Sequence, residues 1–378
     1  MASIKPFTPC FPNMEWLTGL KDGPLRMVQK LLEPKGELVV MQHAERHRDS
    51  LEALIFNNFY HNADLPAIYL YEQESEMGSQ FGIWALTSLD DMLSGKIITH
   101  EDTLSEHREK ISSYRTFVGL EGRPVLFSYE REETISGLAE QVSVMKPDIS
   151  FSYDGADHRL WGITDRTILI ALQQAFSGLS RVYVADGHHR LAAAAALHKQ
   201  TPQWISTLYI TTGQLRCREF HRMVLPKEKI SEEHFLNYLR GYGFISEIPG
   251  NQPHRPQQSM RFGVCFQGKW YQFNLDPALC GPEQRPDVCF LQDEILELFF
   301  GISDPGADSR LLCWPANQWR ELLAYEREHQ QAIVFTLYAI SPAGLVEIAE
   351  NKTALPPKST YTEPKIPYGL LIYDHRSN

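Results

Sequence analysis

The sequence predicts a mixed α/β fold, of the α/β or α+β class, that is divided into two lobes. Segments with the β-branched and aromatic content of strands and segments with the apolar spacing of helices occur together along the chain. They show no clean strand–helix–strand repeat, so the pattern leaves both the α/β and the α+β class open. At 378 residues, the chain is too long for one ordinary domain. We therefore expect one domain over residues 1–230 and a second over residues 231–378.

The first domain is expected to combine short strands with amphipathic helices. Its expected strands are residues 37–41 (ELVVM), 66–71 (PAIYLY), 82–86 (GIWAL), 124–129 (PVLFSY) and 181–185 (RVYVA). Its expected helices are residues 27–32, 134–143, 168–176 and 191–199, the last because a run of alanines has the best intrinsic helix propensity.

The second domain follows a shift in composition. Residues 249–258 are rich in proline, glutamine and asparagine, which predicts a loop. Residues 260–274 predict a hairpin with Gly268 and Lys269 at its turn. Beyond the hairpin we expect helices over residues 293–300, 316–328 and 344–350, and strands over residues 333–339 and 368–373.

Charge and cysteine usage exclude several classes of protein. The formal net charge is -11, and no long basic cluster occurs, so nucleic acid is not expected as a main partner. No two of the 6 cysteines form a C-x-x-C pair, which argues against zinc ribbons and thioredoxin-like sites and predicts free thiols. Residues 1–12 lack a signal-peptide pattern, and no apolar run reaches the length of a membrane span. We therefore expect a cytoplasmic protein with no membrane partner; the oligomeric state is not indicated.

The sharpest motif is residues 185–190 (ADGHHR), between the strand 181–185 and the alanine-rich helix. A helix start carries partial positive charge and unpaired N–H groups, and a glycine there lets a phosphate approach the backbone. Asp186 is a suitable N-cap residue. His188, His189 and Arg190 would add donors at the same end, where cations oppose the helix dipole, so we expect an anion to be held there. The alternative is an N-cap and turn with histidines on the surface.

Other segments carry candidate site residues, each of which is weaker evidence for a functional site when taken alone. Glu101, in residues 100–103 (HEDT), suits a general base or a magnesium ligand, or is part of a solvated loop end. Residues 355–360 (LPPKST) and Lys365 offer amine and hydroxyl donors for a phosphate, or form a surface turn. Two His-Arg pairs form either a basic pocket wall or ordinary surface pairs: His158 with Arg159, and His221 with Arg222. No P-loop, G-x-S-x-G, H-E-x-x-H or G-x-G-x-x-G motif occurs.

These pieces, in this order, resemble the bacterial and archaeal family catalogued as domain of unknown function 1015. The matching stretches are PAIYLY, ITHEDT, PVLFSY, HRLWGITD, VYVADGHHRLAAA, FHRMVL and LPPKSTYTEPKIPYGLLIY. The D-G-H-H-R element also resembles the phosphate-binding box of the ParB and sulfiredoxin-like superfamily. That resemblance implies a nucleotide-binding core with a mixed sheet in the first domain, and a second α/β lobe whose PPKST tail returns to the site. It further implies a relationship to free serine kinases, in which an acid before the box and the Asp within it matter; here these are Glu101 and Asp186.

The leading hypothesis is therefore a nucleotide-dependent phosphotransferase that acts on a small hydroxy amino acid, serine first, with ATP or ADP and magnesium. Asp186 would ligate magnesium or position the substrate hydroxyl, and Glu101 would be the general base. The expected phosphate-binding residues are Gly187, His188, His189, Arg190, Lys358, Ser359, Thr360 and Lys365; the expected pocket residues are His100, Thr103, His158, Arg159, His221 and Arg222. The alternatives are a non-catalytic nucleotide-binding switch, and a metal-dependent hydrolase that uses His100, Glu101, His188 and His189.

Overall fold

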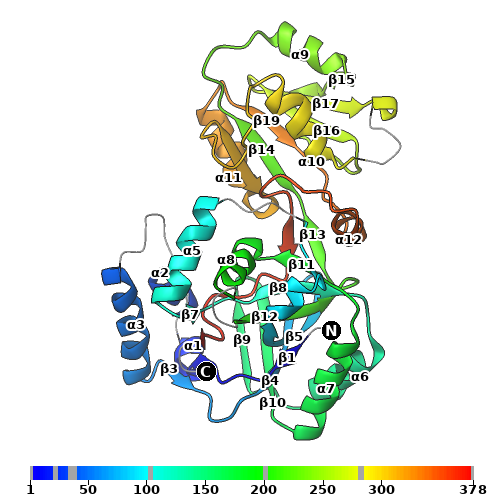
Figure 1. The fold of residues 1–378 in the computed structure, drawn as a ribbon. Helices are drawn as coiled ribbons and strands as arrows, with labels where there is room; N and C mark the ends of the chain where they lie inside the picture. Colours follow the sequence, from blue (N-terminus) through cyan, green and yellow to red (C-terminus); the bar gives the residue numbers. More distant parts are fainter. Residues whose placement is uncertain are drawn as a thin grey trace. The chain divides into compact units, whose positions relative to one another are not determined.

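The structure, a computed structural model, describes residues 3–19, 24–32, 41–100, 105–198, 203–279 and 285–375. The chain forms two compact units, each described by itself below. The first comprises Met1–Thr99, Thr103–Leu215 and Pro364–Asn378, and the second comprises His100–Asp102 and Arg216–Glu363. The predicted mixed α/β class is confirmed (Figure 1). The units differ from the predicted domains, because residues 216–230 lie with the second unit and the tail from Pro364 lies with the first.

A 9-stranded mixed sheet forms the centre of the first unit. Its strands run in the order β6-β11-β8-β12-β5-β4-β10-β9, and β1 also pairs with β5. The pairs β11–β6 and β12–β8 are parallel, and the other pairs are antiparallel. The strands are β1 (Ile4–Lys5), β4 (Ile68–Ser75), β5 (Gly78–Ser88), β6 (Ile97–Ile98), β8 (Val125–Tyr129), β9 (Ile149–Tyr153), β10 (Ala156–Ile163), β11 (Val182–Asp186) and β12 (Trp204–Thr211).

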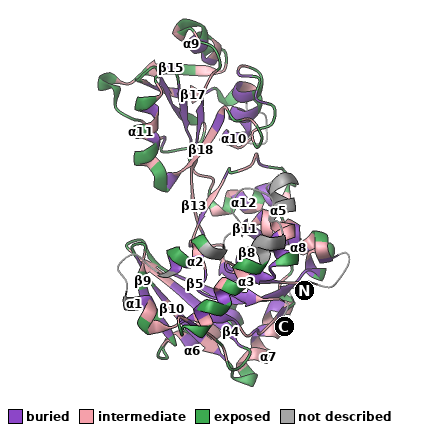
Figure 2. Cartoon of the chain, turned by 90° about the vertical axis from the view of Figure 1, so that its left-hand side faces the viewer, coloured by how far each residue is buried: buried purple, intermediate pink, exposed green. Residues whose placement is uncertain are grey.

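Helices pack against this sheet and bury most of its strand residues (Figure 2). Helix α6 (Glu133–Ser143) packs on α7 (Arg166–Gly178) and against β4 and β10. Helix α8 (His188–His198) packs on α5 (Ser105–Phe117) and against β8 and β12. The short helix α4 (Asp90–Leu93) precedes β6. The core therefore sits between sheet and helices, with side chains such as Val184, Leu172 and Leu191 fully buried.

A further layer of the first unit joins segments from both ends of the chain. It contains β2 (Cys10–Pro12), α1 (Met14–Gly19), α2 (Pro24–Leu32), α3 (Met41–Phe56), β3 (Tyr60–Asn62), β7 (Leu120–Glu121) and β21 (Tyr373–Asp374). Strand β2 pairs with β3, and β21 pairs with β7. The C-terminal tail is held close to residue 122, because Gly369 N donates to Gly122 O at 2.7 Å and Tyr60 Oη donates to Gly369 O at 2.8 Å.

The second unit is built on a 6-stranded antiparallel sheet in the order β15-β17-β16-β19-β14-β18. These strands are β14 (Phe220–Val224), β15 (Gly243–Glu247), β16 (Arg261–Phe266), β17 (Lys269–Leu275), β18 (Leu311–Pro315) and β19 (Ile333–Thr336). A separate ladder pairs β13 (Arg216–Arg218) with β20 (Tyr361–Glu363). The α-helices of the second unit are α9 (Glu232–Arg240), α10 (Asp287–Phe290), α11 (Trp319–Glu328) and α12 (Pro342–Glu350). A π-helix (Leu291–Glu297) follows α10, and short 3₁₀ turns lie at Pro249–Asn251, Pro277–Leu279 and Ala316–Gln318.

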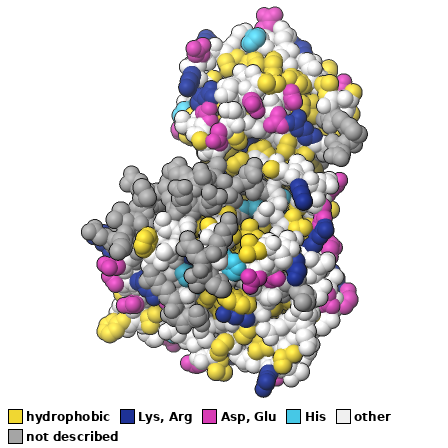
Figure 3. All heavy atoms as spheres, viewed as in Figure 1, with side chains coloured by type: hydrophobic (Ala, Val, Ile, Leu, Met, Phe, Trp, Pro, Cys, Tyr) yellow, Lys and Arg dark blue, Asp and Glu magenta, His cyan; other side chains and the backbone are white. Residues whose placement is uncertain are grey.

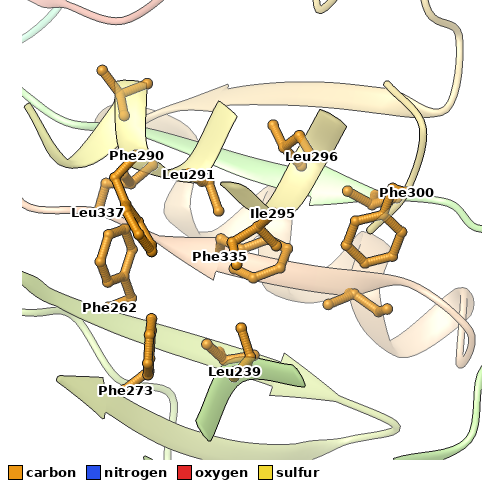
Figure 4. Close-up of a cluster of buried hydrophobic side chains, with 14 of the residues drawn as sticks. Leu239, Phe262, Phe273, Phe290, Leu291, Ile295, Leu296, Phe300, Phe335 and Leu337 are labelled. Carbon is orange, nitrogen blue, oxygen red and sulfur yellow. The ribbon is translucent and has the colours of Figure 1, made fainter. Parts of the chain in front are cut away.

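The two faces of this second sheet bury different helices. Successive side chains of a strand point to opposite faces, and accordingly Ile333 and Phe335 lie in one cluster whereas Val334 lies in another. The first cluster contains Ile295 of the π-helix and Leu239 of α9 (Figure 4). The second contains Leu322 of α11. On the face of this unit seen in Figure 3, acidic and basic side chains are interspersed.

Most of the predicted elements are confirmed, with three exceptions. The predicted strand 368–373 is wrong over residues 368–371, because the tail pairs only at Ile372, which forms an isolated bridge with Cys10, and at Tyr373–Asp374, which form β21. The helix predicted over 293–300 is a π-helix over Leu291–Glu297. Of the predicted strand 37–41, residues 37–40 lie outside the described residues and Met41 begins α3. Cys10, Cys217, Cys265, Cys289 and Cys313 are free thiols, as predicted; Cys280 lies outside the described residues.

Candidate functional site

The predicted strand–loop–helix is present, with β11 ending at Asp186 and α8 beginning at His188. Gly187 joins them with φ +95°, a conformation that side chains other than glycine rarely adopt. Gly187 O accepts the helical hydrogen bond of Leu191 N at 3.0 Å, so Gly187 occupies the N-cap position. The prediction that Asp186 is the N-cap is therefore wrong. Its carboxylate instead pairs with cationic side chains.

Arg190 folds back over Gly187 and is anchored to the start of β8. Its Nη1 donates to the carbonyl oxygens of Arg123 and Pro124, both at 2.7 Å. A Cβ built on Gly187 would lie 2.8 Å from Arg190 Nη2. The same Nη2 lies 3.7 Å from Asp186 Oδ2. Glycine at position 187 therefore leaves the space that the Arg190 guanidinium fills.

Lys365 is brought to this place by the C-terminal tail of the first unit. Its Nζ donates to Asp186 Oδ2 at 3.4 Å. The side chains of Lys365 and Asp186 keep 27% and 33% of their accessible surface, so the pair lies partly open to solvent. The sequence-predicted residues Asp186, Gly187, Arg190 and Lys365 are therefore neighbours.

The electrostatic balance of this cluster is positive. Burial by itself raises the pKa of the Asp186 carboxyl, but the charges of Lys365, Arg190 and Arg123 together hold that pKa well below its ordinary value of 3.8. The pKa of Lys365 is lowered by burial, an effect that Asp186 opposes and that Arg123 and Arg190 reinforce. Three positive charges and one negative charge leave +2 on these four side chains. Like charges in a partly buried place are unfavourable unless an anion joins them.

Arg123 belongs to the cluster although no pattern in the sequence marks it as a site residue. It stands just before β8, in a stretch that carries no recognisable motif. Because β11 and β8 are antiparallel, with Asp186 opposite Leu126, the end of β11 lies beside the start of β8. Only this pairing brings Arg123 within electrostatic reach of Asp186.

A resident magnesium ion does not fit the residues at Asp186. Magnesium prefers several oxygen ligands with a surplus of negative charge. Among the described residues, the Asp186 carboxylate of this cluster already accepts from Lys365, and the three cations would repel a fourth. Within the described residues, no group of three or more His, Cys, Asp or Glu side chains is arranged to hold a metal ion.

The two histidines of the motif differ in exposure. His188 is buried, with 6% of its surface accessible, and His189 is half-buried. Both lie in the first turn of α8, directly after Gly187. His188 is thus enclosed at the helix start instead of lying on the surface. Glu101 and Thr103, the other residues expected near the motif, lie outside the described residues.

His158 and Arg159 lie elsewhere in the same sheet. They belong to β10, which is separated from β11 in the strand order by β8, β12, β5 and β4. His158 Nδ1 lies 2.8 Å from Tyr71 Oη, and the His158 ring stacks on Phe151. Arg159 donates to Glu72 at 2.7 Å. Both side chains therefore stabilise the β4–β10 pair, and the structure does not bring them to Asp186.

The remaining predicted residues lie in the second unit. Arg222, only 1% exposed, donates to Lys358 O at 2.9 Å and to Pro357 O at 3.1 Å, so it fixes the PPKST turn through its backbone. Ser359 Oγ donates back to Pro356 O, and Thr360 follows just before β20. Burial lowers the pKa of His221 to about 4. Burial also lowers the pKa of His100 to about 4, and its carbonyl accepts from Leu355 N at 2.9 Å.

Comparisons with solved structures find several chains at low similarity. A free serine kinase in complex with AMP has 12% identity and a TM-score of 0.43, with 77% of this chain and 90% of that chain covered. SbnI with C-terminal truncation, from Staphylococcus aureus, has 12% identity and a TM-score of 0.42, with 74% and 82% covered. A conserved hypothetical protein from Pyrococcus furiosus has 12% identity and a TM-score of 0.42, with 77% and 94% covered. At these values we transfer no ligand or activity from those proteins.

The remaining comparisons concern membranes, curated proteins and families. No helix among the described residues combines the length and the apolar character that a membrane span requires. No curated protein matches the chain. The profile of the family described as "Protein of unknown function (DUF1015)" matches residues 27–293, well over half of the 378 residues, and the chain belongs to that family.

Proposed function

We propose that this protein binds the phosphate groups of a nucleotide at the cluster of Asp186, Arg190, Lys365 and Arg123. The observation that carries the proposal is the charge of +2 on these four partly buried side chains at the start of α8. A phosphate chain carries negative charge that complements these cations, and phosphate oxygens accept hydrogen bonds from guanidinium and ammonium groups at short range. The N–H groups of the first turn of α8 add favourable partial charge for an anion.

The finer part of the proposal is phosphoryl transfer to a small hydroxy amino acid, with serine as the first candidate. In that reaction a bond forms between the serine Oγ and the terminal phosphorus, and the bond from that phosphorus to the bridging oxygen breaks. The hydroxyl proton passes to a carboxylate, for which Glu101 is the sequence-based candidate. The cationic cluster would hold the transferred group and neutralise its charge, since positioning and electrostatics dominate catalysis of this kind. Any magnesium ion would arrive with the nucleotide as part of the substrate, held by phosphate oxygens.

The role of Asp186 in this scheme is to orient cations. Its carboxylate accepts from Lys365 and lies beside Arg190, so it fixes both donors before a ligand arrives. Preorganised donors need little rearrangement when charge develops in the transition state. Asp186 is thus proposed to act on turnover more than on binding, because a carboxylate near phosphate oxygens also repels them.

The test uses the purified full chain with ATP or ADP, magnesium chloride and L-serine, followed by phosphorus NMR. We expect a phosphoserine resonance with one of the two nucleotides. Asp186→Asn should lose turnover while binding the nucleotide at least as tightly by calorimetry. Asp64→Asn changes an exposed residue and serves as the matched control.

Three outcomes would count against parts of this scheme. No calorimetric signal with ATP or ADP would remove nucleotide binding altogether. Full turnover by Asp186→Asn would remove the positioning role of Asp186. Tight binding without turnover, together with a nucleotide-dependent change in oligomeric state, would favour the nucleotide-binding switch over the kinase.

A further inference from the structure

The Arg123 side chain differs from the other two cations of the cluster in its contacts. Arg190 donates to two carbonyl oxygens, and Lys365 donates to Asp186. Within the described residues, the Arg123 guanidinium forms no hydrogen bond or ion pair, and its Nε is buried there without a hydrogen-bond partner. A buried donor of this kind costs free energy in the ligand-free protein, so its retention calls for an explanation.

The neighbours of Arg123 show where its guanidinium acts. Its charge lowers the pKa of Asp186 and of Lys365, so the guanidinium lies within electrostatic reach of both. It also lies within electrostatic reach of Tyr71, but the Tyr71 hydroxyl is already bonded to His158 Nδ1 at 2.8 Å. The Arg123 carbonyl oxygen meanwhile accepts from Arg190. The backbone of residue 123 therefore holds Arg190 in place, while the Arg123 side chain remains available to a ligand.

We infer that Arg123 binds the ligand directly and makes the site selective for a doubly charged phosphate group over a singly charged one. The three cations and the Asp186 carboxylate together carry a net charge of +2, which matches two negative charges. A terminal phosphate monoester carries about two charges above its second pKa near 6, whereas a phosphodiester carries one. The guanidinium fork also suits two oxygens of one phosphate, which a lysine ammonium does not match. This inference rests on the proposed phosphate site but does not require that the ligand be a nucleotide.

The melting temperature of the ligand-free protein distinguishes a ligand-binding role of Arg123 from a structural one. A structural arginine loses its hydrogen bonds when it is replaced, and the melting temperature falls. Arg123 has no such bonds to lose within the described part of the chain, and its removal lowers the charge of the cluster from +2 to +1. Arg123→Gln should therefore melt at the same temperature as the wild type, or at a higher one, in the absence of ligand.

Binding is measured by calorimetry with four probes: inorganic pyrophosphate, ADP, AMP and the 5′-methyl phosphodiester of AMP. The wild type should prefer AMP to its methyl diester. Arg123→Gln should bind pyrophosphate and ADP roughly 10- to 100-fold more weakly, as expected for a lost charge-assisted hydrogen bond. It should also lose most of the preference for the monoester. Arg123→Lys should recover part of the affinity, and Arg131→Gln, which changes an exposed arginine, should match the wild type.

The possible results distinguish failure of the inference from failure of the proposed function. Pyrophosphate binding without ADP binding would remove the proposed nucleotide function and leave the role of Arg123 in place. ADP binding of equal strength in wild type and Arg123→Gln would overturn the inference and leave the proposed function in place. A lower melting temperature or failure to fold for Arg123→Gln would assign Arg123 a structural role and also overturn it. Absence of binding by every probe would refute both.

Discussion

Lys365 Nζ donates to Asp186 Oδ2 at 3.4 Å, although 179 residues separate the two along the chain. The contact exists because the C-terminal tail returns to the first unit after the chain has formed the second. Gly369 anchors that return, since a Cβ at this position would lie 2.6 Å from Val28 Cγ1. One side of the candidate site is therefore supplied by the last residues of the chain.

Replacement of Lys365 by Met should weaken anion binding far more than it weakens the fold. The Lys365–Asp186 pair keeps about a quarter to a third of its surface, and a pair this exposed is worth about 1 kcal/mol or less. Loss of a cation from the site should lower pyrophosphate affinity roughly tenfold. Thermal shift with and without pyrophosphate measures both effects. Lys146→Met, at an exposed position, is the control; a large fall in stability with unchanged binding would contradict this assignment.

Gly187→Ala should destabilise the protein by about 1–3 kcal/mol and reduce anion binding. The backbone at residue 187 has φ +95°, which strains any residue with a Cβ, and the added atom would collide with the Arg190 guanidinium. Urea unfolding gives the stability change. Gly137→Ala is the matched comparison, because residue 137 lies in α6 with open space around it, and it should stabilise by about 0.5–1 kcal/mol. Equal effects at the two positions would show that residue 187 is not strained.

His221 should make the protein less stable as the pH falls from about 6.5 towards 4. Burial lowers its pKa from 6.5 to about 4 in the folded protein, so the unfolded chain binds more protons in that window. The free energy of unfolding therefore rises with pH in this window, by up to about 1.4 kcal/mol per pH unit. The stabilisation that comes from neutral His221 is complete above pH 6.5. In His221→Asn the amide oxygen keeps an acceptor for Leu337 N, which now donates to His221 Nδ1 at 3.3 Å.

The measurement is urea unfolding at pH 7.5, 6 and 5. His221→Asn should show a shallower loss of stability on acidification than the wild type. His234→Asn, which changes an exposed histidine of α9, should leave the slope unchanged. Identical slopes for the wild type and His221→Asn would rule out His221 as a source of the pH dependence.

Replacing only one partner of the Arg115–Glu121 pair should destabilise the fold more than replacing both. Both side chains are buried, at 5% and 12% exposure. Arg115 also donates to Trp204 O at 2.6 Å, and Glu121 accepts from Ser206 N at 3.0 Å, so the pair ties α5 and β7 to β12. Arg115→Met leaves a buried carboxylate unpaired and should cost about 3–5 kcal/mol. The double variant Arg115→Met with Glu121→Gln should be less destabilised, and additive losses in urea unfolding would contradict the coupling.

The local part of the site could be read from the sequence. A β-branched and aromatic stretch, a glycine and an alanine-rich run predict strand, turn and helix over residues 181–199, and β11 and α8 form there. These signals are local because hydrogen bonds within a helix and the φ freedom of glycine involve neighbouring residues only. The N-cap was misassigned because a carboxylate that caps a helix and one that pairs with cations look the same in a sequence.

The tertiary structure alone decided which charges meet. Arg123 carries no motif and reaches Asp186 through the antiparallel β11–β8 register. Lys365 arrives through the returning tail, whereas Lys358 belongs to the second unit. His158 and Arg159, which looked like site residues, serve the β4–β10 pair. Pairing between distant segments depends on sheet order and on burial of whole faces, and no short stretch of sequence encodes either one.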